Sequence, residues 1–290
     1  MNDAAKLALQ RAREAEIVGA LPEAVLAYDE AIRLDPDDIG VYSAKGLFLG
    51  RRGRLQEAIE MFRRSTALKP TYVDHYNTGN MLHALGRNDE AFVEFDAAVA
   101  IDPSQTEGWC NRGVALYALG RNDEAKTSFD RAIALDDRSV NAYHCKAILM
   151  QKIGDKSAAV AARRKVTELA PSAAAYIDLA NALRDGLGDK ILWEPKGVEE
   201  QIVEALDAAL SLPCDKKQHV WCWAEKLLRL QRIAHGRQSA RRAGTPIEDG
   251  PAILRYCEAT EIAVGMYPED NWMSEKRDDA QLLKLSLPLL

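Results

Sequence analysis

The sequence predicts an all-α fold made of antiparallel helix pairs repeated in tandem. The stretch Ala-Leu-Gly-Arg-Asn-Asp-Glu-Ala occurs at 84–91 and again at 118–125. Glycines recur at nearly the same spacing, at Gly19, Gly53, Gly86, Gly120 and Gly154. A proline or an aspartate stands about midway between one glycine and the next, at Pro36, Pro70, Pro103 and Asp137, and Pro171 follows the last glycine at the same distance. A period of about 34 residues is typical of arrays of helix–turn–helix units.

Each repeat contains two amphipathic stretches that are separated by the glycine. Glycine adopts the left-handed backbone conformation that ends a helix, which residues with a Cβ atom resist. Asn88 and Asn122 follow closely after their glycines, where we expect them to act as N-caps of the second helix. The acidic residues that follow them suit the positive end of a helix. The proline then ends the second helix, and the next unit begins.

Small and aromatic residues recur at positions that we expect to be buried between the two helices. The small residue is alanine in every unit, at Ala24, Ala58, Ala91, Ala125 and Ala159. An aromatic ring follows one helical turn later in four units, at Tyr28, Phe62, Phe95 and Phe129. The fifth unit has Arg163 at this position. Burial of each ring contributes about 1.5–3 kcal/mol to stability.

This pattern resembles the tetratricopeptide repeat family. Its unit places a large residue, a small residue, an alanine, an aromatic residue, a second small residue and a proline in that order. The fourth unit shows this order with Trp109, Gly113, Ala125, Phe129, Ala132 and, in place of the proline, Asp137. The match covers about residues 5–171, although Ala12 and Ala147 replace the small glycine in the first and fifth units. The resemblance implies a right-handed α-α superhelix, with five tandem units in residues 1–171.

The sequence after residue 171 departs from the regular pattern. We expect residues 172–273 to form degenerate helix pairs with an inserted loop at about 186–197, which is rich in glycine and proline. Helices are predicted at 198–211, about 217–235 and about 251–266. The segment 274–290 is rich in leucine and is predicted to be a capping helix, because a solenoid needs a cover on its open end. The alternative is that these leucines form a homo-oligomer contact.

Composition excludes several classes of protein. The formal net charge of −6 argues against a protein that coats nucleic acid. The five cysteines include no C-x-x-C pair, which argues against a disulfide framework and a zinc site. We therefore expect reduced thiols in a cytoplasmic protein. We expect no signal peptide and no membrane span, because the sequence has neither a cleavable apolar start nor a sufficiently long apolar run.

No catalytic constellation stands out, so the sequence predicts that the protein is not an enzyme and needs no metal or cofactor. Phosphate-binding, nucleophile-elbow and metalloprotease motifs are all missing from the sequence. His144 and Cys145 are adjacent, but neighbouring residues on a helix diverge by about 100° and do not face each other. We interpret Cys145 as a packing residue.

The resemblance also implies that the first helices of the repeats line a concave groove that binds a partner peptide or protein. Carried over by position, the groove residues are Tyr76, Asn77, Asn80, His83, Asn111, Tyr117, Asn141, His144, Asn181 and Arg184. A row of asparagine amides can hold an extended peptide backbone, and the family's sugar-transferase members use such a row. Asn77 and Asn111 occupy equivalent positions in adjacent units. The alternative is that asparagine merely fills an exposed helix surface.

A second surface supports an alternative function. The stretch 215–242 has a large excess of lysine and arginine and contains Trp221 and Trp223. Basic residues beside aromatic rings can contact RNA or an acidic partner, so a nucleic-acid-associated or regulatory protein is the second hypothesis. The simpler interpretation is a solvated helix face with tryptophans in the core.

Overall fold

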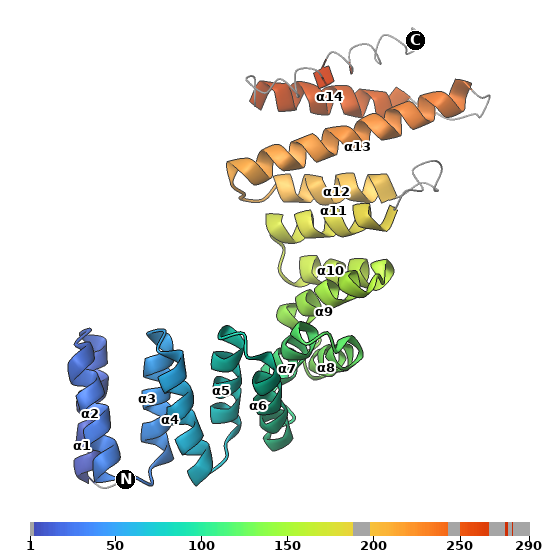
Figure 1. Cartoon of the computed structure of the whole chain (residues 1–290). Helices are drawn as coiled ribbons and strands as arrows, with labels where there is room; N and C mark the ends of the chain where they lie inside the picture. Colours follow the sequence, from blue (N-terminus) through green and yellow to red (C-terminus); the bar gives the residue numbers. More distant parts are fainter. Residues whose placement is uncertain (1–2, 188–197, 243–249, 267–275, 278–279, 281–290) are drawn as a thin grey trace. The chain divides into compact units, whose positions relative to one another are not determined.

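The computed structural model describes residues 3–187, 198–242, 250–266, 276–277 and 280. All secondary structure in these residues is helical, without a strand (Figure 1). The helices form two compact units, Met1–Leu149 and Met150–Leu290. None of the helices in the described residues has both the length and the apolar character needed to cross a bilayer. The predicted all-α fold of helix pairs is confirmed. The predicted division of the repeats at residue 171 stays a prediction.

The N-terminal unit is built of consecutive helix pairs. Its helices are α1 (Asp3–Ile17), α2 (Leu21–Leu34), α3 (Ile39–Arg51), α4 (Leu55–Leu68), α5 (Tyr72–Ala84), α6 (Asn88–Ile101), α7 (Thr106–Ala118), α8 (Asn122–Leu135) and most of α9 (Val140–Ile153). Each first helix packs on the second helix of its own repeat, as the pairs α1–α2, α3–α4 and α5–α6 show in Figure 1. In addition, α3 contacts α5 and α5 contacts α7, so the first helices of adjacent repeats adjoin one another.

The turns between paired helices confirm one prediction and correct another. All five turn glycines have positive φ angles, between 75° and 83°. The expected N-caps are wrong, because α6 and α8 begin at Asn88 and Asn122 and these side chains cap no backbone N–H. The residue before each helix is an arginine, and its guanidinium bonds the glutamate in the first helical turn at 2.7 Å, as in Arg87–Glu90 and Arg121–Glu124. This ion pair stabilises the first helical turn in place of the expected cap by an asparagine side chain.

The buried glycines and rings of the N-terminal unit fit one another. A Cβ atom on Gly79 would lie 2.6 Å from the ring of Phe95, and one on Gly113 would lie 2.5 Å from the ring of Phe129. Both rings are buried. The small residue therefore makes space for the aromatic ring of its own repeat, as the sequence pattern predicts.

Adjacent repeats of the N-terminal unit are joined by a recurring ion pair. A cation in the middle of a first helix meets an aspartate on the preceding second helix in Lys45–Asp29, Arg112–Asp96 and Lys146–Asp130, at 2.5–2.7 Å. The third repeat has Thr78 at the position of the cation.

The third repeat is joined to the second by a different, buried polar network. The carboxylate of Asp74 accepts hydrogen bonds from the hydroxyls of Ser43, Ser65 and Thr71 at 2.6, 2.7 and 2.9 Å. Asp74 is almost fully buried, and the three hydroxyls supply the hydrogen bonds that a buried carboxylate needs.

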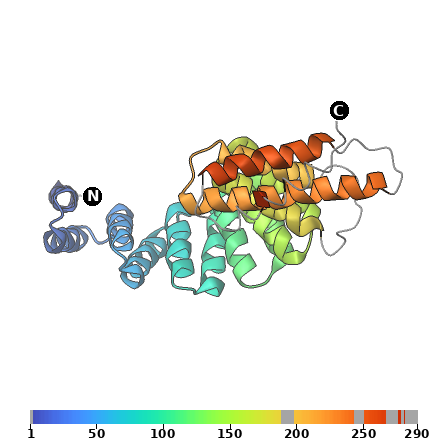
Figure 2. The ribbon, with the colours of Figure 1, turned by 90° about the horizontal axis from the view of Figure 1, so that it is seen from above.

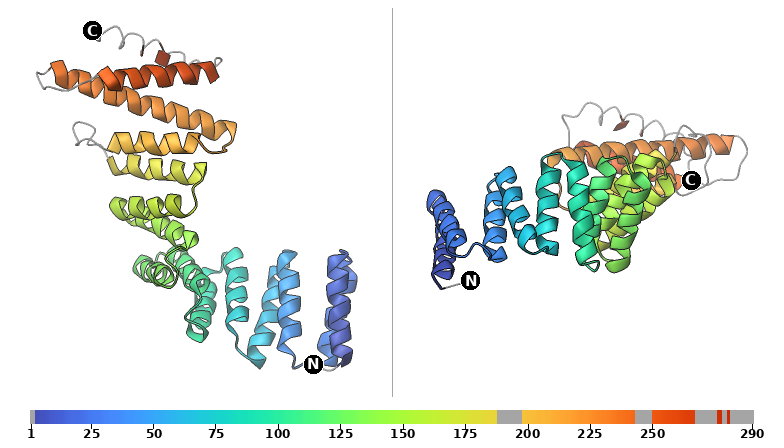
Figure 3. Two further views of the ribbon diagram at one scale, coloured as in Figure 1. Left: turned by 180° about the vertical axis from the view of Figure 1, so that it is seen from behind. Right: turned by 60° about the horizontal axis from the view of Figure 1, so that its bottom comes forward.

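The C-terminal unit contains α10 (Lys156–Leu169), α11 (Ala173–Leu187), α12 (Val198–Leu210), α13 (Lys216–Arg242) and α14 (Gly250–Met266). Each of these helices packs on the next one, and Figure 2 and Figure 3 show α13 and α14 side by side. The helix predicted at 198–211 is confirmed by α12, and the one at about 251–266 by α14.

Two predicted boundaries in this unit are wrong. Helix α13 continues to Arg242, well past residue 235, because the added residues are mostly good helix formers such as alanine, glutamine and arginine. Helix α11 continues through Gly186 to Leu187, because a single glycine costs only about 1 kcal/mol in a helix. The rest of the predicted inserted loop, 188–197, lies outside the described residues.

The chain after α14 returns to the core of the C-terminal unit. Ala280 is buried with Trp223, Leu227 and Tyr256. The thiol of Cys257 donates to the carbonyl oxygen of Ala280 at 3.1 Å. Most of the segment 274–290 lies outside the described residues, so the capping helix and the homo-oligomer contact stay predictions.

Candidate partner-binding face

Three of the predicted groove residues form a hydrogen-bonded cluster between α5 and α7. The amide nitrogen Nδ2 of Asn111 donates to Oδ1 of Asn80 at 2.7 Å and to the hydroxyl of Tyr76 at 3.2 Å. All three side chains are half-buried. The ring of Tyr76 is held by stacking on Tyr72, with ring centres 5.6 Å apart and an angle of 14°. The cluster thus joins the first helices of the third and fourth repeats.

Asn77 is not part of this cluster, although it occupies the position equivalent to Asn111. The reason is helical geometry. Tyr76 and Asn80 are one turn apart and share a side of α5, whereas Asn77 is rotated from Tyr76 by about 100°. Among the described residues, no side-chain hydrogen bond reaches Asn77. The structure therefore pairs Asn111 with Asn80, which lies almost one turn beyond Asn77 on α5.

The other predicted residues of the N-terminal unit lie elsewhere on α5, α7 and α9. His83 is exposed, and its Nδ1 lies 2.7 Å from Oδ1 of Asn88. Tyr117 is half-buried on α7. Asn141 and His144 are exposed on α9, and Oδ1 of Asn141 accepts from the thiol of Cys145 at 3.6 Å.

His144 and Cys145 do not form an activated thiol pair. The imidazole is exposed, whereas the thiol is half-buried, and burial raises the pKa of Cys145. A nucleophilic cysteine needs the opposite shift, because the thiolate is the reactive form. The interpretation of Cys145 as a packing residue agrees with this environment.

Asn181 and Arg184 lie on α11 of the C-terminal unit. The guanidinium of Arg184 is 3.8 Å from Asp185 and 3.9 Å from Glu225. Asn181 is half-buried. The predicted residues therefore divide between the two units, and in the described residues only the N-terminal unit gathers several of them into one cluster.

Aliphatic side chains and one carboxylate stand near the cluster, because Glu107 is exposed on α7 one helical turn before Asn111, at the position equivalent to Val73. We call the inner face the surface formed by Leu47, Val73, Tyr76, Asn80, Asn111 and Val114 on α3, α5 and α7. Leu47 and Val73 are exposed aliphatic residues, 39% and 52% accessible. Repeat equivalence places Leu47, Asn80 and Val114 at one position of successive first helices. The inner face therefore combines amides, one hydroxyl and aliphatic groups, with the carboxylate of Glu107 beside them on α7.

The first repeat differs from the inner face in charge. Arg13 stands at the position equivalent to Leu47 and Asn80. With Lys6, Leu9 and Gln10 it lines a hollow of about 420 Å³ on α1.

Several side chains of the basic stretch 215–242 make contacts within the C-terminal unit. The ammonium of Lys226 lies 4.5 Å from the ring centre of Trp223 and 2.5 Å from the carboxylate of Asp207. Arg229 is buried and pairs with Glu225 at 2.5 Å. Trp223 is a core residue. These contacts favour the simpler interpretation of this stretch, in which its tryptophans belong to the core.

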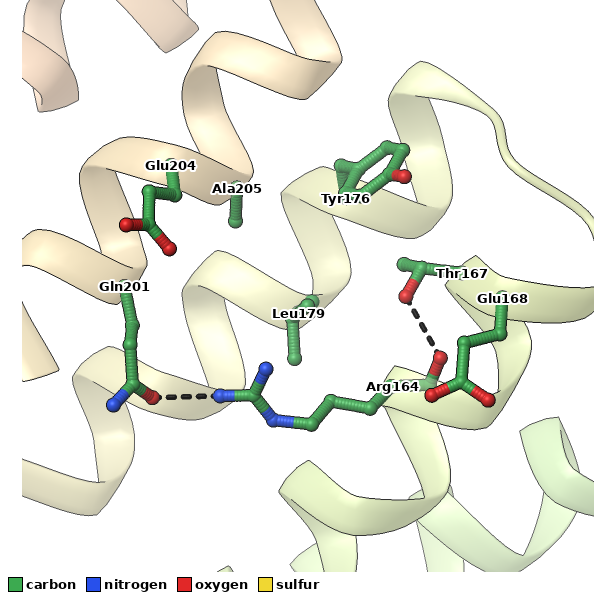
Figure 4. A pocket seen from close by; sticks show the side chains of 8 residues that line it. All are labelled: Arg164, Thr167, Glu168, Tyr176, Leu179, Gln201, Glu204 and Ala205. Atoms are coloured by element: carbon green, nitrogen blue, oxygen red, sulfur yellow. Dashed lines mark hydrogen bonds between the residues drawn. The ribbon is translucent and has the colours of Figure 1, made fainter.

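A second hollow lies between α10, α11 and α12, and sequence reasoning did not point to it (Figure 4). The guanidinium of Arg164 crosses it and donates to Oε1 of Gln201 at 2.6 Å. The carboxylate of Glu168 pairs with Lys165 at 2.6 Å. Leu179 contributes an apolar side chain to its wall. At about 220 Å³ the hollow is smaller than most ligand pockets, and its arginine is already engaged.

Comparison with known proteins identifies the repeat. Family models described as TPR repeat and tetratricopeptide repeat match residues 9–73, 79–120 and 106–139. Residues 9–73 and 79–139 therefore carry tetratricopeptide repeats. A human member, tetratricopeptide repeat protein 7A, is 32% identical over 95 residues, which are 32% of this chain and 11% of that protein. The chain therefore spans a small part of that relative.

Solved structures of tetratricopeptide repeat proteins share the fold. The C-terminal part of a protein from Cytophaga hutchinsonii matches with a TM-score of 0.65 and 14% identity, over 92% of this chain and 98% of that one. YrrB, described as a TPR protein with an unusual peptide-binding site, matches with a TM-score of 0.53 and 19% identity, over 67% of this chain and 96% of its own. At these identities the likeness concerns the fold.

Proposed function

We propose that this tetratricopeptide repeat protein is an interaction scaffold that binds a segment of a partner protein along the inner face. The observation that carries the proposal is the Tyr76–Asn80–Asn111 cluster, which joins two repeats by side-chain hydrogen bonds. Asparagine is a poor helix former, whereas the apolar core of this repeat is filled by Phe95 and its neighbours, with the ring of Tyr76 packed beside them. A binding role accounts for the two asparagine amides, which add no apolar surface to this core. The proposal assigns the chain no reaction of its own.

The family and one structural neighbour support a peptide or protein partner. Tetratricopeptide arrays expose long surfaces formed by consecutive repeats, which suit extended ligands. The printed description of YrrB names a peptide-binding site in that protein. We extend this class of ligand to the present chain as part of the proposal.

The test starts with a pull-down from the native cell, followed by calorimetry of the captured partner with the purified chain. We expect the double substitution Asn80→Ala and Asn111→Ala to weaken binding by about tenfold or more. Each lost amide contact costs about 0.5–1.5 kcal/mol, and about 1.4 kcal/mol corresponds to a factor of ten. Helicity should be kept, because alanine is the better helix former.

Two matched variants make this test specific. Gln10→Ala removes an amide at the position of repeat 1 that is equivalent to Asn111, and we expect it to leave binding unchanged. The double substitution Asn77→Ala and Asn111→Ala removes the two asparagines at equivalent positions, of which only Asn111 belongs to the cluster. It should weaken binding less than the Asn80 and Asn111 pair does. If the Asn80 and Asn111 variant binds as tightly as the parent, the inner face is not the site.

A cytoplasmic location is also part of the proposal. It is supported by the five cysteines, all of which are free thiols. Disulfides form mainly in oxidising compartments. Cell fractionation with thiol labelling before lysis tests this point, and recovery of the chain in an extracellular or periplasmic fraction would contradict it.

A further inference from the structure

We infer that the chain binds a second copy of itself through α1, with the two α1 helices antiparallel across a two-fold axis. The contact lies outside the inner face, so the inference does not rest on the proposed function. Three observations carry it. Later repeats use the equivalent side of their first helix for packing, this side is exposed in α1, and its residues complement a second copy of themselves.

The side of α1 that carries Leu7, Arg11 and Glu14 is exposed, although later repeats bury the equivalent side against the repeat before them. Asp74, at the position of Leu7, bonds Ser65 on the preceding helix α4 at 2.7 Å. Leu7 itself is 58% accessible. None of the described helices covers this side of α1. The residues at the position of Leu7 are buried in each of the next four repeats, as Val41, Asp74, Gly108 and Ala142.

Arg11 stands at the position of a cation that joins adjacent repeats. The equivalent residues in three later repeats each bind an aspartate on the preceding second helix, and they are Lys45, Arg112 and Lys146. Arg11 instead bonds Glu30 of its own repeat at 2.7 Å, in a solvent-exposed ion pair. Exposed ion pairs contribute little to stability. Arg11 can therefore exchange Glu30 for a carboxylate of another chain.

Glu14 distinguishes this side of α1 from the equivalent sides of the later repeats. The residues at its position are all apolar, and they are Phe48, Met81, Ala115 and Leu149. A regular second helix packed on α1 would bury the Glu14 carboxylate against apolar groups, which is costly. A suitable partner must bring a cation to Glu14 as well as a carboxylate to Arg11. A second α1 brings both.

The stripe of exposed residues on α1 matches itself when two copies run antiparallel. Leu7, Arg11, Glu14 and Val18 are aliphatic, basic, acidic and aliphatic, in steps of four, three and four residues. Residues at these steps share one side of a helix, and the N–H of Val18 still bonds the carbonyl oxygen of Glu14 at 3.2 Å. Read in reverse, the steps are the same and the two charges exchange places. Each Arg11 thus meets the partner's Glu14, and each Leu7 meets the partner's Val18.

The two-fold arrangement sets the size of the assembly. Each copy uses the same surface, so the contact closes after two chains. Parallel helices in the same register would instead place like charges opposite one another. The interface between two single helices is small, which is typical of weak, transient contacts. Such a dimer carries two inner faces, which suits a partner with two copies of the bound segment.

Sedimentation velocity of the full chain measures this association. The weight-average molar mass is followed from about 5 μM to about 500 μM, the range of weak interfaces, at about 0.05 M salt, where exposed charges are little screened. The variants are Arg11→Glu, Glu14→Arg and the double substitution of both. Arg13→Glu is the matched control, because Arg13 is exposed on another side of α1 and its substitution changes the charge equally. Circular dichroism verifies folding.

We expect the molar mass of the parent to rise with concentration from that of one chain toward that of two. Each single variant places like charges opposite one another twice, and its dissociation constant should rise by about tenfold or more. Arg13→Glu should associate like the parent. The double variant should recover, because it exchanges the two charges. An equimolar mixture of the two single variants should also form dimers, since the two chains then complement each other.

Four results would overturn the inference. The parent stays at the mass of one chain throughout, or its mass continues to rise beyond that of two chains, which indicates a head-to-tail contact. Both single variants associate like the parent, which places the contact elsewhere, such as the leucine-rich segment 274–290. The single variants lose association but neither the double variant nor the mixture recovers it, which shows that Arg11 and Glu14 do not meet.

Discussion

The N-terminal unit repeats one apolar contact from repeat to repeat, and its buried carboxylate Asp74 is held by hydroxyls, whereas in the C-terminal unit a buried arginine is held by a carboxylate. Gly79 with Phe95 and Gly113 with Phe129 are two copies of one arrangement. In the C-terminal unit, Arg229 is buried and pairs with Glu225. An apolar contact is stable with any neighbour of the right volume, but a buried charge needs one particular partner. The two units should therefore respond differently to substitution, and three predictions test this difference.

The largest expected effect is the loss of a repeat ring. Phe129→Ala should destabilise the chain by about 3–5 kcal/mol, because the cavity that it leaves lies against the backbone of Gly113 and cannot easily collapse. Thermal or denaturant unfolding of the purified chain measures the change. Arg121→Ala is the control, because Arg121 is exposed and surface ion pairs contribute about 0–1 kcal/mol. Equal losses in the two variants would contradict the repeat assignment at this unit.

An intermediate effect is expected from the buried ion pair of the C-terminal unit. Arg229→Met should cost about 2–3 kcal/mol, because Glu225 is then left without its close partner. The expected loss of stability is smaller than that of Phe129→Ala because Arg184 remains 3.9 Å from the carboxylate of Glu225.

A double-mutant cycle distinguishes the charge from the packing of Arg229. Arg229→Met combined with Glu225→Met should recover most of the stability that Arg229→Met alone loses, since apolar replacement of both partners removes the unpaired charge. Additive losses in the double variant would show that Arg229 acts through packing and not through Glu225.

The smallest effect on the fold is expected from thiol reagents at neutral pH. Burial raises the pKa of Cys110 to about 12 and that of Cys222 to about 11, one in each unit. Because the thiolate is the reactive form, both should stay unmodified at neutral pH and react only as the pH rises toward these values. Mass spectrometry after alkylation checks this, with half-buried Cys214 as the internal comparison. Rapid modification of Cys110 in the folded chain would be the contrary result.

The regular part of the fold follows from the sequence because it depends on local volume and backbone conformation. The turn glycines, the alanines and the aromatic rings keep the same role in successive repeats, so the repeat period alone locates them. The N-caps could not be located in this way, since Asn88 is a favourable capping residue but Arg87 with Glu90 takes over the first turn. Residue type alone does not decide which of two ways of stabilising a helix start is used when their energies are similar.

The candidate site was predictable in its helices but not in its contacts. The residues Tyr76, Asn80 and Asn111 were all expected on the binding face, but repeat equivalence only placed Asn77 and Asn111 one repeat apart and did not predict that Asn111 bonds Asn80 and Tyr76. The angle between side chains on α5 decides this contact, and a rule based on equal positions ignores it. The length of α13 was missed for another reason, because no proline or glycine cluster marks its end before residue 242.

The Asp74 network fixes the order in which the repeats can be connected. The ion pair between repeats is interchangeable in principle, because Lys45, Arg112 and Lys146 all meet an aspartate at the same position of the preceding helix. The third repeat is the exception, since Asp74 needs the hydroxyls of Ser43 and Ser65. The other repeats have alanine or valine in place of Ser65. A chain built by duplicating or shuffling these modules would thus tolerate extra copies of the fourth repeat, whereas the third repeat is acceptable only directly after the second.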